Sequence, residues 1–131
     1  MVGSMIQTFG GSRTEKIKAN YFINTKKRYQ NFELKMTIKC SGDPATGLIN
    51  SGIQIRSERV AGGTHMSGYQ VDCGDGWFGK IYDEFRRGKV IAEPVDAEAL
   101  KKVVDVFGWN KYCIRAEGLR IQVWINDVLA I

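Results

Sequence analysis

The segment Phe32–Cys40 (FELKMTIKC) restricts the fold of this chain more than any other stretch. Five apolar residues in it alternate with four polar ones: Glu33, Lys35, Thr37 and Lys39. A period of two places the two sets on opposite faces of a β-strand, whereas a helix would repeat about every 3.6 residues. The segment therefore predicts a half-buried strand, and its apolar face requires a second layer to cover it.

Shorter segments with strand-like composition or alternation occur along the rest of the chain. We expect further strands in Ala19–Asn24, Ile53–Ser57, Tyr69–Cys73, Lys80–Phe85, Trp109–Ala116 and Leu119–Ile125. Polar and glycine-containing turns lie between several of them. Seven short strands predict a mostly antiparallel β-sandwich, and we expect Trp109 in its core.

One segment, Asp96–Phe107, has a helical period. Asp96 is a suitable N-cap and Gly108 is placed to end the helix. Four apolar residues recur at helical spacing: Leu100, Val103, Val104 and Phe107. We therefore expect one short helix, over about residues 96–107, with this stripe packed on the sandwich.

The length and composition indicate a single folded domain. The chain has 131 residues, 44% of them hydrophobic, and no apolar run reaches the roughly 18 residues that cross a bilayer. We expect residues 10–131 to form the domain, after an N-terminal segment 1–9 in which Val-Gly-Ser resembles a cloning remnant. The start does not resemble a signal peptide, so the native compartment stays undetermined.

The net charge of +5 does not indicate a nucleic-acid site. The basic residues are spread along the chain, and Lys26–Arg28 is the one run among them. A nucleic-acid surface would gather them on one face with stacking aromatic residues. We therefore expect no nucleic-acid partner.

The three cysteines, Cys40, Cys73 and Cys113, are widely spaced and lie in or beside strand-like segments. A free cysteine in such a place behaves as a small buried hydrophobe. We expect three reduced thiols, and neither a disulfide nor a zinc site.

Two of the predicted strands have an unusual polar face. Gln54 and Arg56 alternate with apolar residues in one, and Gln70 and Asp72 do so in the other. If both sets share a sheet face, that face carries amide, guanidinium and carboxylate groups suited to a polar ligand. The alternative is a cross-strand ladder in which Arg56 and Asp72 only pair with each other.

The order of these segments resembles a known family. The residues that carry the resemblance are GGSRTEKIKANYFINTKKRYQNFELKM, NSGIQIRS, GYQVDCGDGWFGKIYDE and WNKYCIRAEGLRIQVWIND, across about residues 10–130. They are similar to the 3-keto-disaccharide hydrolase domains, formerly a domain of unknown function. The resemblance implies a concanavalin A-like jelly-roll sandwich with a carbohydrate site on its concave face. It also implies secreted or periplasmic relatives that act on oxidised sugars or glycosides.

The chain departs from the family near its end. Family members continue with further strands after the Trp-x-Asn turn, whereas this sequence stops at Ile131, and Asp127 stands where glycine is usual. We expect a sandwich that is C-terminally truncated, as a short form or a fragment. Its open strand edges would be completed by a second copy, most simply in a homodimer.

The resemblance also suggests roles for residues. A 3-keto group acidifies the neighbouring C–H bond, so one base and one cation suffice for cleavage by elimination. We expect Asp72 or Asp83 as the base and Arg56 as the electrostatic stabiliser. The substrate-binding candidates are Gln54, Gln70, Trp77, Tyr82, Gln122 and Trp124.

Hydrolysis of an ordinary glycoside would instead need two carboxyl groups about 5–10 Å apart. Asp75 and Glu84 join Asp72 and Asp83 as candidates, whereas His65, alone in a glycine-rich loop, is more typical of an exposed histidine. We expect no cofactor; carboxylates and amides on one face would suit Ca²⁺, but the DCGDG segment does not fit an EF-hand.

The leading hypothesis is a carbohydrate-active enzyme that cleaves 3-keto-glycosides, of hydrolase or lyase type. The alternatives are a non-catalytic, lectin-like carbohydrate-binding module and a structural, oligomer-forming sandwich whose site has decayed. Fold alone does not choose between them.

Overall fold

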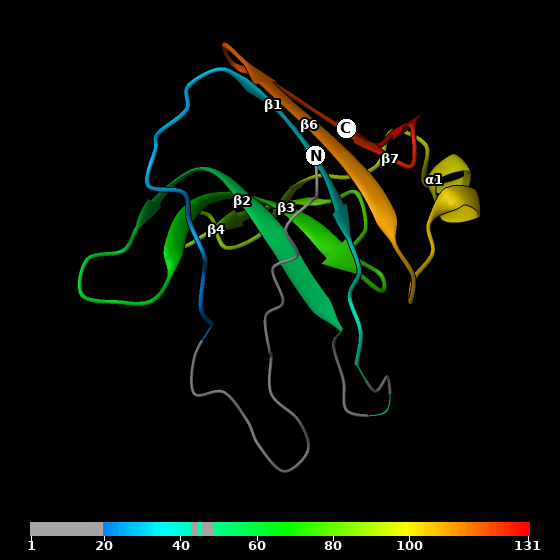
Figure 1. The fold of residues 1–131 in the computed structure, drawn as a ribbon, viewed down its shortest axis with the longest axis horizontal. Helices are drawn as coiled ribbons and strands as arrows, with labels where there is room; N and C mark the ends of the chain where they lie inside the picture. Colours follow the sequence, from blue (N-terminus) through cyan, green and yellow to red (C-terminus); the bar gives the residue numbers. More distant parts are fainter. Residues whose placement is uncertain (1–19, 43–44, 46–48) are drawn as a thin grey trace, which may run out of the picture.

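Two four-stranded antiparallel sheets form two layers (Figure 1). The computed structural model describes residues 20–42, 45 and 49–131, so segment 1–9 lies outside the described residues. The "β6 sheet" has the strand order β1(Phe32–Ile38), β6(Asn110–Glu117), β7(Arg120–Ile125), β8(Val128–Leu129). The "β3 sheet" has the order β2(Asn50–Arg59), β3(Met66–Gly74), β4(Ile81–Glu84), β5(Val90–Ala92). The predicted sandwich is confirmed.

The apolar faces of both sheets meet in one core. In the β6 sheet, Leu34 pairs with Ile114 and Ile114 with Val123, which aligns the apolar residues of three strands on one face. In the β3 sheet, Ile53 pairs with Val71 and Val71 with Ile81. The most buried members of the combined core include Val71, Ile114, Val123, Ile125 and Ala130. Alternation in the sequence thus assigned most inward positions correctly.

The helix is shorter than expected. α1 spans Ala97–Val103, and Asp96 caps it by accepting a hydrogen bond from the backbone N–H of Ala99 at 2.9 Å. The chain leaves the helix at Val104, so Phe107 falls outside it and is exposed. Leu100 is buried and contacts the site of Gly79, where an added Cβ would lie 2.6 Å from its side chain. α1 contacts β8 and is not long and apolar enough to span a membrane.

Two further expectations are wrong. The described part of the Ala19–Asn24 segment is not a strand; Arg59 instead holds it by hydrogen bonds to the carbonyl of Phe22 and to Asn24. Trp109 is 56% exposed because β6 begins only at Asn110, after a bend that turns the indole outward. Aromatic composition alone did not distinguish a buried strand from a surface loop.

The turn between β7 and β8 is held by one side chain. Asn126 and Asp127 both have positive φ, 49° and 68°, as a two-residue hairpin turn of the I′ type requires. The amide oxygen of Asn126 accepts from Lys111 N–H at 2.8 Å, and its NH₂ group donates to Val103 O at 2.7 Å and Asn110 Oδ1 at 2.9 Å. Asn126 therefore ties the turn to the start of β6 and the end of α1.

We predict that Asn126→Ala lowers the free energy of unfolding by about 2–3 kcal/mol, because three hydrogen bonds and a residue tolerant of positive φ are lost together. Asp127→Gly should raise it by about 0.5–1 kcal/mol, since glycine adopts positive φ at less cost. Urea unfolding of both variants tests this. Equal effects of the two changes, or a stabilising Asn126→Ala, would contradict it.

Candidate functional site

A row of hydrogen-bonded polar side chains follows the outer face of the β3 sheet, the face turned away from the core. Gln54 lies opposite Gln70 in the ladder, and its Nε2 donates to Gln70 Oε1 at 3.0 Å. Gln70 Nε2 donates to Asp72 Oδ1 at 2.8 Å, and Ser57 Oγ donates to Gln54 Oε1 at 2.6 Å. The "polar row" is therefore Ser57, Gln54, Gln70 and Asp72. The structure brings three of the four expected polar residues together.

Two glycines make room for this row. Gly52 pairs with Asp72, and a Cβ on it would lie 2.4 Å from Cγ of Gln70, so the Gln70 side chain occupies that space. Gly68 does the same for Ser57, whose Oγ would lie 2.2 Å from an added Cβ. Side chains at these positions would displace the amides and the hydroxyl from the sheet surface.

Arg56 does not join the row, because β2 is irregular between Ile55 and Glu58. Arg56 has φ of 49°, and its guanidinium donates to the carbonyl of Gln30 at 3.3 Å. The irregularity shifts the alternation, so Ser57 takes the position beside Gln54 that strict alternation assigned to Arg56. The Arg56–Asp72 pair of the alternative, a plain cross-strand ladder, is not formed.

Asp72 is the most unusual member of the row. It is 1% exposed, and among the described residues its Oδ2 has no hydrogen-bond partner. Burial raises the pKa of Asp72 to about 6, and the nearby charge of Glu84 adds to the rise, whereas the hydrogen bond from Gln70 and the charge of Lys80 oppose it. A carboxyl group with such a pKa can accept and return a proton near neutral pH.

Aromatic and charged side chains flank the row. Tyr82 pairs with Gln70 in the ladder and so shares its face. The rings of Trp77 and Tyr82 meet edge to face at 6.4 Å, and Lys80 Nζ lies 5.4 Å from the centroid of Trp77. Trp77 and Tyr82 therefore lie next to each other beside the row, and Lys80 adds a cation there.

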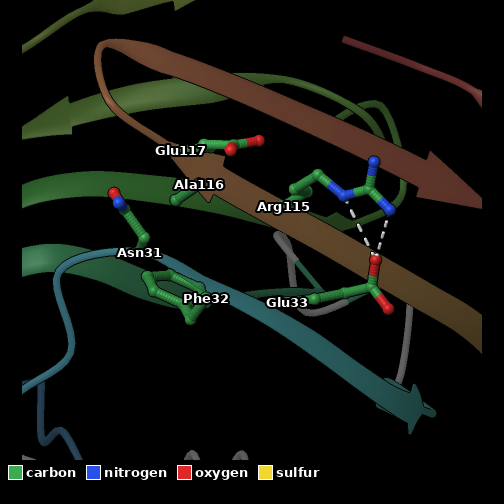
Figure 2. Close-up of a pocket in the computed structure, with 6 residues that line it drawn as sticks. All are labelled: Asn31, Phe32, Glu33, Arg115, Ala116 and Glu117. Atoms are coloured by element: carbon green, nitrogen blue, oxygen red, sulfur yellow. Dashed lines mark hydrogen bonds and ion pairs between the residues drawn. The ribbon is translucent and has the colours of Figure 1, made fainter.

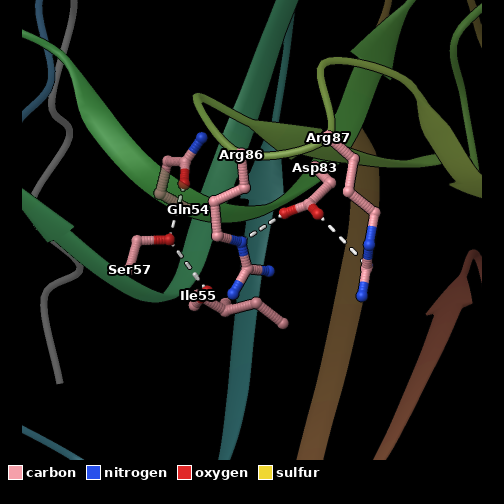
Figure 3. A network of polar contacts seen from close by, with 6 residues as sticks. All are labelled: Gln54, Ile55, Ser57, Asp83, Arg86 and Arg87. Atoms are coloured by element: carbon pink, nitrogen blue, oxygen red, sulfur yellow. Dashed lines mark hydrogen bonds and ion pairs between the residues drawn. The ribbon is translucent and has the colours of Figure 1, made fainter.

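Asp83 lies on the opposite face. It pairs with Tyr69 in the ladder and is 0% exposed. Figure 3 shows it between two arginines: Arg86 Nε donates to Oδ1 at 2.6 Å, and an Nη of Arg87 lies 3.1 Å from Oδ2. The Arg86 guanidinium also stacks on Tyr69, 4.3 Å from the ring centroid. Asp83 thus anchors the β4–β5 turn, and Glu84 is the neighbour that shares a face with Asp72.

Gln122 and Trp124 belong to the other layer. They lie on the outward face of β7 in the β6 sheet, where Gln122 pairs with Arg115 and Trp124 with Cys113. The core separates them from the polar row. The expectation that they extend the same surface is wrong, because alternation identifies a face but not which of two sheets carries it.

A notch of about 180 Å³ lies at one end of the β6 sheet. Figure 2 shows its lining residues: Asn31, Phe32, Glu33, Arg115, Ala116 and Glu117. Arg115 donates to Glu33 at 2.7 Å across it, and Lys35 binds the same carboxylate. The notch is smaller than the roughly 300 Å³ of the smallest usual ligand sites, and its charges pair with each other.

Sequence reasoning missed Ser57 and Lys80, whereas Glu84 was among the candidate carboxyl groups. Gly68 was a signal for Ser57, since a glycine within a strand often marks a close approach or a bulge. The sheet face that Lys80 and Glu84 share with Asp72 could have been predicted by aligning the predicted strand Lys80–Phe85 with Tyr69–Cys73 in antiparallel register. His65 is partly buried between Phe22 and Phe85, and the described residues contain no group of three or more His, Cys, Asp or Glu placed to hold a metal ion.

The fold and this sheet face define a two-layer β-sandwich domain with a hydrogen-bonded polar surface. Comparison with protein-family models matches residues 3–131 to the family described as "3-keto-alpha-glucoside-1,2-lyase-like domain". The chain belongs to this family, as its motifs suggested. Comparison with curated proteins found no match.

We predict a specific pH dependence for Asp72→Asn. The folded pKa of Asp72, about 6, exceeds its ordinary value of 3.8, so the folded state holds this proton more tightly than the unfolded chain. Ionisation of Asp72 therefore lowers stability as pH rises from about 4 to 6, by roughly 2–3 kcal/mol in all. Asp72→Asn has no carboxyl group to ionise at this position, so its stability does not fall in this pH range for this reason.

Urea unfolding at pH 4 and pH 7.5 measures this difference between the two proteins. The free energy of unfolding of Asp72→Asn, relative to that of the wild type, should rise between the two pH values. Asp75→Asn, an exposed carboxylate in the following turn, is the control and should show almost no change. A constant difference for Asp72→Asn would show that Asp72 titrates normally.

Proposed function

We propose that this protein cleaves 3-keto-glycosides, or closely related glycosides, on the outer face of the β3 sheet. The observation that carries the proposal is Asp72: a buried carboxyl group with a pKa of about 6, at the end of an amide row, whose Oδ2 has no hydrogen-bond partner in the described part of the chain. Membership of the 3-keto-alpha-glucoside-1,2-lyase-like family supports the substrate class.

The chemistry requires few groups. A ketone at C3 of the sugar acidifies the C–H bond at C2. A base removes that proton, the electrons form an enolate, and the C1–O bond then breaks to release the leaving alcohol. A cation near the enolate oxygen stabilises the developing charge, and a proton donor assists the leaving group.

Asp72 is our candidate base. Lys80 is our candidate for the cation, because its charge acts on Asp72 whereas Arg56 is turned to Gln30. Gln54, Gln70 and Tyr82 are placed to bind sugar hydroxyls, and Trp77 to pack on a sugar ring. If an ordinary glycoside is hydrolysed instead, Glu84 is the partner carboxyl group for Asp72.

A second candidate function is a non-catalytic carbohydrate-binding module. It is favoured by the near-complete enclosure of Asp72, and by the hydrogen bonds that already engage the amides of the row with each other. A binding surface needs those amides to be fixed, but needs no proton transfer.

We predict that the wild-type protein releases the alcohol from 3-keto-trehalose-type substrates, and that Asp72→Asn lowers kcat/KM by about 10²–10⁴-fold. Product release measured by chromatography tests this, with unmodified trehalose as the substrate control. Glu98→Gln, an exposed change on α1, is the matched variant and should retain activity. Binding without turnover would favour the module, and neither binding nor turnover would refute both.

We further propose that the protein forms a homodimer through its strand edges. β5 and β8 are terminal strands of the two sheets, and a hydrogen bond from Val95 N–H to Ala130 O at 2.9 Å joins the segments beside them. Exposed apolar side chains lie on these segments: Ile91, Val95 and Leu129. Pairing with a second copy would cover them.

We predict that wild-type protein sediments as a dimer and that Leu129→Lys, which places a charge on the β8 edge, converts it to a monomer. Leu119→Lys is the matched control, because Leu119 is fully exposed in the β6–β7 turn and away from that edge. Analytical ultracentrifugation distinguishes the species. A monodisperse wild-type monomer would refute the dimer.

A further inference from the structure

We propose that Cys40 and Cys73 form an oxidative modification site, in which a disulfide would join the two sheets through the core. Their Sγ atoms lie 3.5 Å apart, within hydrogen-bonding reach. Both thiols are free in the structure. A disulfide needs an S–S distance of about 2.05 Å, so the two sulfur atoms must approach by only about 1.5 Å.

The topology makes this contact a cross-link between layers. Cys40 follows β1 of the β6 sheet, two residues beyond Ile38, and packs against the common core. Cys73 lies in β3 of the other sheet, on its inward face, and is 1% exposed. A bond between them would close a loop from the edge strand of one sheet to an inner strand of the other.

The two thiols have unequal roles. Cys40 is partly exposed, and its hydrogen bond with Cys73 lowers the pKa of the Cys40 thiol. The same contact, together with burial, raises the pKa of the Cys73 thiol. Cys40 is therefore the thiol that an external reagent meets first as a thiolate, and Cys73 is the resolving thiol behind it.

The oxidant in this proposal is a low-molecular-weight disulfide, RS–SR. The Cys40 thiolate attacks one of its sulfur atoms, which forms Cys40–S–SR and expels RS⁻. The Cys73 sulfur, on losing its proton, attacks Cys40 and expels the second RS⁻. Two cysteine thiols are oxidised, one reagent disulfide is reduced, and both protons are taken up by the released thiolates.

The cross-link would also reach the polar row. Cys73 directly follows Asp72, whose carbonyl accepts a hydrogen bond from the hydroxyl of Tyr112 in β6 at 3.2 Å. The disulfide would add a covalent bond beside this hydrogen bond between the sheets. The inference does not depend on what the β3 sheet binds, because it rests on the thiols alone.

The test uses the reduced full-length chain incubated with oxidised glutathione. Intact mass and peptide mapping should show the loss of two hydrogen atoms and a Cys40–Cys73 cross-link, and the melting temperature should rise by about 10 °C, reversibly with a reductant. Cys113→Ser should behave as wild type, because Cys113 lies on the outward face of β6. Cys40→Ser and Cys73→Ala should not form the link.

Two outcomes would overturn the proposal. One is wild-type protein that stays folded and keeps the Cys40 and Cys73 thiols alkylable, or carries only a stable glutathione adduct at Cys40. The other is a cross-link that involves Cys113 or forms only in denaturant. The decisive comparison, wild type against Cys113→Ser, does not depend on the folding of the core variant Cys73→Ala.

Discussion

The burial of apolar side chains between the two sheets is the interaction on which the rest of the structure depends. Val71, Ile114 and Val123 are completely buried, and each such side chain contributes about 1.5–3 kcal/mol when removed from water. This burial fixes which face of each strand is turned inward. The register then decides which polar residues share the outer face, so the polar row is a consequence of the core.

The predictable part of the fold followed from this alternation. The strand from Phe32, the inward sets of β3 and β7, and the cap at Asp96 were all evident in the residues. The helix end was not, because Val104 and Phe107 continue the apolar spacing after the helix has ended at Val103. Position along a helical period does not show where hydrogen bonding stops.

The candidate site was predicted in part, for reasons that concern pairing. Gln54, Gln70 and Asp72 could be grouped because alternation along each strand shows which residues lie on its polar face. The position of Arg56 was predicted wrongly because β2 contains one extra residue between Ile55 and Glu58, which the composition does not reveal. The position of Trp124 was predicted wrongly because the sequence does not show which of the two sheets contains β7. Asp72 and Asp83 lie on opposite faces of the sheet because of the register in which β3 pairs with β4. That register cannot be read from the sequence of either strand alone. The two buried carboxyl groups consequently differ. Two arginines pair with Asp83, whereas Asp72 accepts a hydrogen bond from the Gln70 amide, and its Oδ2 has no hydrogen-bond partner among the described residues.

The contacts of Asn126 have a consequence for how the molecule opens. One side chain joins the β7–β8 turn, the first residues of β6 and the last turn of α1, three segments that are distant in the sequence. A local fluctuation that frees any of them must release the shared amide and weaken its hold on the other two. These segments should therefore behave as one cooperative unit in native-state hydrogen exchange, with similar protection of their backbone amides. The β3 sheet and its polar row lie outside that unit, so the side of the molecule that carries the candidate site can remain closed while the opposite side opens.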